Sequence, residues 1–160
     1  MSKTKLSAYL LGRGIMLFAH LLLFSFVYFI TAKLFHFDFG MKYPALILVV
    51  FSVLGVFTTA FGLLLSAFAN DDNTAWRFGV LVLLPTSILS GALFPFDAMP
   101  ESLQAVGNLF PQRWITSAIE ILQNGGNFAD TLLPLLGVLS LSIVFFVTAS
   151  VRLNKRRNIF

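Results

Sequence analysis

The sequence predicts an all-α integral membrane protein with four transmembrane helices and two short extracytoplasmic helices between the third and fourth spans. Uncharged apolar stretches cover most of the chain, at residues 14–32, 43–70, 78–96 and 131–151. A helix rises about 1.5 Å per residue, so ~20 apolar residues cross a hydrocarbon core about 30 Å thick. The chain is also 58% hydrophobic and 11% charged. Soluble domains are about 25% charged, so this composition excludes a water-soluble fold.

All four spans belong to one transmembrane domain covering residues 1–160, and we place them at about 10–35, 44–69, 77–96 and 130–152. The first span follows Lys3 and Lys5, as in a signal peptide, but it is too long and lacks a convincing cleavage site. We therefore expect it to be retained. The connections at 33–42 and 70–77 are short, which makes neighbouring helices antiparallel.

Small residues follow one side of the second span. They are Ser52, Gly55, Thr59, Gly62 and Ser66. Their alternating spacing of three and four residues places them on one side of a helix. Small side chains let helices approach closely in lipid, so we expect a helix-packing face, within the chain or between subunits. A polar stripe that lines a pore is the alternative.

The third span contains Pro85, with Ser87, Ser90 and Gly91 close behind it. Proline removes a backbone hydrogen bond, so this segment predicts a kink or local unwinding. The alternative is a tolerated membrane-helix proline with no role in transport.

The third connection is long, and prolines divide it. Pro95 and Pro100 lie at its start, and Pro111 lies in its middle. Proline favours the first turn of a helix, so we expect short helices at about 100–110 and 112–124. Gly125 and Gly126 suit the end of the second one. Neither helix is long enough to cross a bilayer, so the pair either caps the outer surface or dips partway into the membrane.

Arg113 and Glu120 lie seven residues apart, on one face of the second short helix. They form either a weak ion pair on a solvated face or an electrostatic gate or ligand contact near the outer mouth. The full candidate outer gate or substrate path comprises Pro95, Pro100, Pro111, Arg113, Trp114 and Glu120.

The distribution of basic residues predicts the orientation, because lysine and arginine are enriched in cytoplasmic segments. With the N-terminus inside, eight of the 11 basic residues fall on the inner side. These are Lys3, Lys5, Arg13, Arg77, Arg152, Lys155, Arg156 and Arg157. Lys33, Lys42 and Arg113 fall outside. We expect a multi-pass protein of the bacterial inner or plasma membrane with both termini in the cytoplasm.

Catalytic and metal-binding patterns are missing from the sequence. It contains no G-x-x-x-x-G-K-[ST] phosphate loop, no H-E-x-x-H and no G-x-S-x-G, and it has two histidines and no cysteine. We therefore expect no cofactor, no metal and no enzymatic activity in this chain. The basic tail at 152–157 follows a span, so we expect it to contact membrane lipids rather than nucleic acid.

Three segments together resemble the C-terminal half of type 2 ABC exporter permeases. They are LSGALFPFDAMP at 89–100, NLFPQRW at 108–114 and GLLLSAFAND at 62–71. In that family a span ends in S-G-x-x-x-P, a P-x-x-W/Y step opens a short helix, and an earlier span ends in G-x-x-x-S. The resemblance runs from about residue 7 to 152. Such permeases usually have six spans, and the four here align with the last four.

The resemblance implies a membrane subunit, or the C-terminal part of one, of an ATP-driven exporter of drugs, antibiotics or lipid-linked molecules. It also implies a separate ABC ATPase subunit that hydrolyses ATP. The further partner is a second permease subunit, in a homo- or heterodimer, or a missing N-terminal permease fragment. Two alternatives remain: a small non-transporting membrane protein that assembles or stabilises another complex, and a self-sufficient four-span multidrug carrier.

Overall fold

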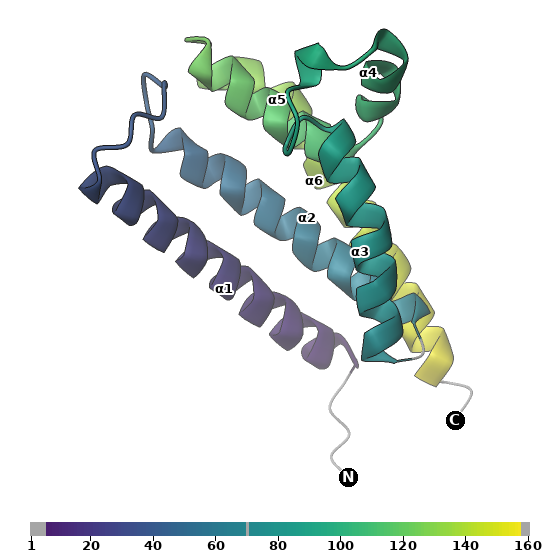
Figure 1. Ribbon diagram of the computed structural model, residues 1–160. Coiled ribbons are helices and arrows are strands. Elements are labelled where there is room, and N and C mark those ends of the chain that lie inside the picture. Colours follow the sequence, from purple (N-terminus) through teal and green to yellow (C-terminus); the bar gives the residue numbers. More distant parts are fainter. Residues whose placement is uncertain (1–5, 70, 158–160) are drawn as a thin grey trace.

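The structure, a computed structural model, describes residues 6–69 and 71–157, and its elements in these ranges are all helical (Figure 1). They are α1 (Leu6–Leu34), α2 (Leu46–Phe68), α3 (Asp72–Leu89), the 3-10 helix η1 (Phe96–Ala98), α4 (Glu101–Gly107), α5 (Pro111–Gln123) and α6 (Phe128–Arg157). The all-α class is thereby confirmed. Lys3 and Lys5, two of the basic residues that predict a cytoplasmic N-terminus, lie outside the described residues.

Three of the described helices are long and apolar enough to cross a membrane. These segments are Gly14–Leu34, Leu46–Phe68 and Phe128–Lys155. The α3 helix has 18 residues, and Asp72, Asn73 and Arg77 make its first turns polar. It is therefore not among the three segments whose length and composition alone suffice to cross a membrane. The chain is a multi-pass membrane protein.

The α2 helix occupies the middle of the bundle, with α1 on one side and α6 on the other (Figure 1). Its most extensive packing is against α6, which also packs against α5. The main buried core lies between these elements and includes Val50, Phe57, Ile115, Ala118, Leu135 and Val138. Apolar side chains from α2, α5 and α6 thus hold the bundle together.

The two ends of the bundle differ in structure. At one end α5 meets the connection between α1 and α2, where the Gln123 side-chain amide donates a hydrogen bond to the Phe39 carbonyl over 3.3 Å. At the other end the C-terminal part of α6 lies beside the last turn of α2, with the Arg152 guanidinium 4.9 Å from the centre of the Phe68 ring. The α3 helix runs from this second end back to the first (Figure 1).

The α3 helix begins at Asp72, earlier than the expected start near 77, because Asp71 caps it. The Asp71 carboxylate accepts hydrogen bonds from the Thr74 hydroxyl (2.7 Å) and the Thr74 backbone N–H (2.8 Å). The second bond satisfies one of the backbone N–H groups that have no partner within the first turn of a helix. These two hydrogen bonds also lower the pKa of Asp71 below its ordinary value, and the bond from the Thr74 hydroxyl has the larger effect.

The α3 helix ends at Leu89, before the end of the span that the sequence places at about 77–96. Gly91 adopts a left-handed conformation with φ 87°. The Gly91 N–H bonds to the Ile88 carbonyl, and the Ala92 N–H bonds to the Ser87 carbonyl. This arrangement is a Schellman motif, which closes a helix and turns the chain away. Pro85 lies inside the helix.

The short helices follow the prolines closely. Pro100 immediately precedes α4. This helix ends at Gly107, three residues before the end expected from the sequence, at about 110. Pro111 is the first residue of α5. A second glycine with positive φ, Gly125 at 81°, follows the end of α5 and permits the turn into α6.

Candidate functional site

Arg113 and Glu120 do meet. An Arg113 guanidinium nitrogen lies 2.6 Å from a Glu120 carboxylate oxygen. The guanidinium also stacks on the Phe96 ring, 3.7 Å from its centre. The Arg113 side chain is only 12% exposed, whereas that of Glu120 is 43% exposed. Arg113 is therefore enclosed by η1 and α5, and the ion pair reaches the surface only on its acidic side.

Hydrogen bonds tie the start of α5 to the end of α3, next to Arg113. The Thr116 hydroxyl donates to the Ser90 carbonyl over 2.6 Å. The Gln112 side-chain amide donates to the Thr86 hydroxyl over 2.7 Å, and the Thr86 hydroxyl in turn donates to the Val82 carbonyl. The two links between α3 and α5 leave no signal in the sequence, because the residues in each lie 26 positions apart with no shared motif.

Trp114 fixes the other side of α5. Its indole N–H donates to the Asn108 carbonyl at the end of α4, over 2.9 Å. Its ring lies against Gly137 of α6, where an added Cβ would come within 3.1 Å of the ring. Glycine at this position allows the indole to lie on the helix backbone. Trp114 thus connects α4, α5 and α6.

The three candidate prolines lie at the starts of elements. Pro95 precedes η1, Pro100 precedes α4, and Pro111 opens α5. Their fixed φ angles set where each short element begins. Of the candidate gate residues, Arg113 and Glu120 come into direct contact.

The small residues of α2 have different neighbours along the helix. Gly55 is buried against α1, and a Cβ there would come within 3.4 Å of the Phe18 ring and 3.6 Å of the Leu21 side chain. A Cβ on Gly62 would meet nothing within 4 Å. The stripe therefore provides close packing at Gly55 and open space at Gly62.

The hydroxyl groups of this stripe are used mainly within α2 itself. Ser52 donates to the Leu48 carbonyl and Ser66 to the Gly62 carbonyl. Such bonds satisfy a hydroxyl at membrane depth without a partner helix. The buried Thr59 hydroxyl has no hydrogen-bond partner among the described residues.

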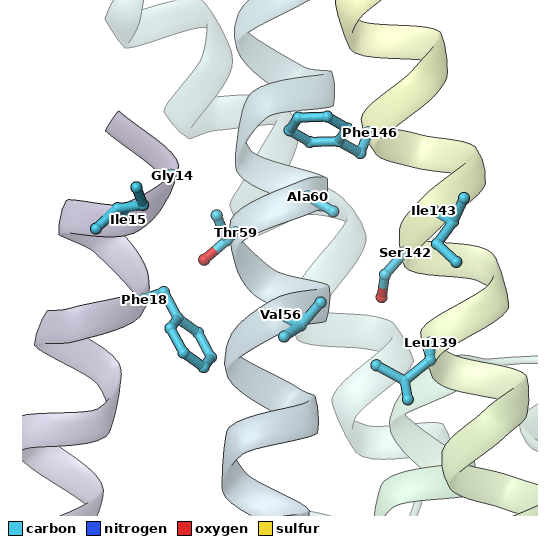
Figure 2. Close-up of a pocket in the computed structure, with 10 residues that line it drawn as sticks. All are labelled: Gly14, Ile15, Phe18, Val56, Thr59, Ala60, Leu139, Ser142, Ile143 and Phe146. Carbon is cyan, nitrogen blue, oxygen red and sulfur yellow. The ribbon is translucent and has the colours of Figure 1, made fainter. Parts of the chain in front are cut away.

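A second feature is an apolar cavity of about 490 Å³ over the middle of α2, between α1 and α6 (Figure 2). Figure 2 shows Phe18 of α1, Val56 of α2 and Leu139 of α6 around the same space. The lining is completed by Gly14, Ile15, Thr59, Ala60, Ser142, Ile143 and Phe146. The lining suits an apolar group and offers no charged side chain to it.

The described residues place no group of three or more His, Asp or Glu side chains close enough to hold a metal ion. The site consists of an enclosed arginine, hydrogen bonds that join α3 to α5, and an apolar cavity between α1, α2 and α6. These features define a multi-pass helical membrane protein with a folded hairpin at one end.

Residues 1–152 match the family described as ABC-2 family transporter protein, so the chain belongs to that family. The resemblance to type 2 ABC permeases is thereby confirmed.

Named relatives match over part of their length. The linearmycin resistance permease protein LnrN of Bacillus subtilis is 28% identical over 113 residues, which are 69% of this chain and 28% of that protein. The probable multidrug ABC transporter permease YbhS of Escherichia coli is 30% identical over 74% of this chain and 32% of its own length. Nodulation protein J of Rhizobium leguminosarum is 29% identical over 68% of this chain and 41% of its own length. The chain spans about a third of the length of these relatives. No solved structure matches it.

Proposed function

We propose that the chain is a four-span membrane part of an ATP-driven ABC exporter, with α3 as the third span and α4 and α5 on the outer side. Membership of the ABC-2 family supports the transporter class. The span count rests on a single observation, namely the path of α3 between the two ends of the bundle.

The α2–α3 connection lies at one end of the bundle, and α5 lies at the other, bonded to the connection before α2. If α2 crosses the membrane, α3 has to return the chain to the side from which α2 started. Its 18 residues rise about 27 Å, close to the ~30 Å of a hydrocarbon core. Its polar first turn then lies at the inner interface.

Under this topology α4 and α5 form an outer hairpin over the bundle, held by Arg113 and Trp114. The hairpin is compact because each of its links is short: the indole bonds to Asn108, and Thr116 bonds to Ser90. Such a unit closes the outer end of a path and moves as one body when the bundle rearranges.

The substrate class follows from the names of the relatives, two of which are a linearmycin resistance permease and a probable multidrug permease. We infer an apolar or amphipathic small molecule as cargo, which agrees with the apolar cavities. Energy comes from ATP hydrolysis on a separate ABC ATPase subunit, and the remaining membrane helices come from a second permease chain or fragment. The host membrane is then a bacterial inner membrane, with both termini of this chain in the cytoplasm.

Co-purification tests the partner. We expect the tagged chain, extracted from its native membrane in mild detergent, to bring down an ABC ATPase in a stable ratio, identified by mass spectrometry. A mock purification from cells with the tag alone gives the background. An active, transporting complex that contains no ATPase would contradict the proposal.

A further inference from the structure

A second apolar groove, of about 510 Å³, separates α2 from α3. One face of α2 lines it with Thr58, Phe61, Gly62 and Leu65, and one face of α3, between Ala75 and Ser87, lines the opposite side together with Ala92 and Leu93. Gly62 widens it, because a Cβ there would meet nothing within 4 Å. Gly79 is buried, and a Cβ there would lie 3.3 Å from the end of the Leu65 side chain. The two helices therefore approach each other at Gly79 and leave open space at Gly62.

The dimensions of the groove suit a single hydrocarbon chain. Trp76 and Ser87, near its two ends, are separated by roughly 17 Å along α3. One leaflet of a hydrocarbon core is about 15 Å deep, half of the whole. The length of the groove thus fits one acyl chain within one leaflet.

Basic side chains gather at one end of the groove. Trp76 lines it there, is 73% exposed, and is followed by exposed Arg77. The Arg152 guanidinium lies over Phe68, one turn beyond Leu65 of the groove lining, and Lys155 follows on α6. Tryptophan is enriched at the level of lipid headgroups, and arginine binds phosphate oxygens with two donors at once.

We propose that this groove binds one acyl chain of an anionic phospholipid, with the phosphate of its headgroup beside Arg77 and Arg152. The lipid fills space that Gly62 leaves open and couples α3 to α2 across the inner leaflet. The inference rests on the membrane-crossing α3 of the proposed function. It adds a specific ligand and a specific site to that topology.

The charged end is tested by native mass spectrometry of the full purified chain in detergent, titrated with phosphatidylglycerol or with phosphatidylcholine. We expect phosphatidylglycerol to bind more tightly. In R77Q/R152Q its affinity falls roughly thirtyfold, to the level of phosphatidylcholine, because each basic residue contributes to anionic lipid binding. K33Q/K42Q is the matched control, since it removes two basic residues from the other end of the bundle and retains the preference. Equal binding of both lipids by the unaltered chain overturns the proposal.

The apolar part is tested by Gly62→Leu, which fills the groove. Both lipids then bind roughly tenfold more weakly, since the added side chain occupies the place of the acyl chain. Gly12→Leu on α1 is the control, because its Cβ also meets nothing within 4 Å. Unchanged binding by a helical, monodisperse Gly62→Leu protein overturns the proposal. If that variant misfolds, R77Q/R152Q still decides, and neither assay uses ATPase or transport, so a failed exporter function leaves both results unchanged.

Discussion

Gly107→Ala is expected to destabilise the protein by about 3 kcal/mol, the largest effect of any single added methyl group in the chain. Gly107 is the buried last residue of α4. An added Cβ would overlap the backbone carbonyl oxygen of Leu89 and come within 2.8 Å of the Phe96 ring. A backbone carbonyl at the end of α3 cannot move aside as a flexible side chain can. Thermal unfolding of the detergent-purified variant measures the loss.

Gly62→Ala is the matched control for this substitution. It also adds one methyl group to a helical glycine, but into open space. Alanine has the higher helix propensity, so the control is expected to be as stable as the unaltered chain or up to ~1 kcal/mol more stable. A Gly107→Ala protein that unfolds at the same temperature as the control would show that α4 does not pack against the end of α3.

Glu120→Gln is expected to cost about 1–2 kcal/mol, more than an ordinary surface ion pair contributes. The reason is the burial of its partner: the Arg113 side chain is 12% exposed and lies over Phe96. Without the carboxylate, a largely desolvated guanidinium keeps its charge but loses its counter-ion. Chemical or thermal unfolding of the purified chain, compared with Glu101→Gln, measures the difference. Glu101 is exposed in the first turn of α4, so that control should change stability by less than ~0.5 kcal/mol.

The double variant R113M/E120Q separates an ion pair from simple helix damage. Methionine retains apolar contact with the Phe96 ring and removes the buried charge. We expect the double variant to be more stable than Glu120→Gln alone, because the unpaired charge is gone. Additive losses in the double-variant cycle would contradict a direct coupling between the two side chains.

The lengths of the apolar stretches predicted where the long helices lie. The residues at which α3 begins and ends depend on local hydrogen bonds, which hydropathy does not report. The charges near 71–77 were interpreted as loop, yet Asp71 caps a helix that begins at Asp72. A polar first turn is compatible with a membrane helix when it lies at the interface. Gly91, noted as a possible point of unwinding, ends α3 instead, because its positive φ permits the closing hydrogen bonds.

The Arg113–Glu120 contact was foreseeable because both residues lie on one helix and spacing sets their common face. The enclosure of Arg113 was not, since Phe96 covers it only after the chain turns at Gly91 and folds back. For α2, spacing defined one side of the helix but not the neighbour on that side. Gly55 meets Phe18 of α1, while Gly62 opens onto the groove beside α3.

The four-span topology is tested most directly by finding on which side of the membrane two single cysteines lie. The chain has no cysteine of its own, so each introduced cysteine is labelled alone. Asn73→Cys lies at the start of α3 and Ser102→Cys lies in α4, and both positions are exposed. In intact cells a membrane-impermeant maleimide should label the cysteine at 102, and the cysteine at 73 should react only after the membrane is permeabilised. Labelling of both positions from the same side would show that α3 does not cross the membrane, and would contradict the four-span topology.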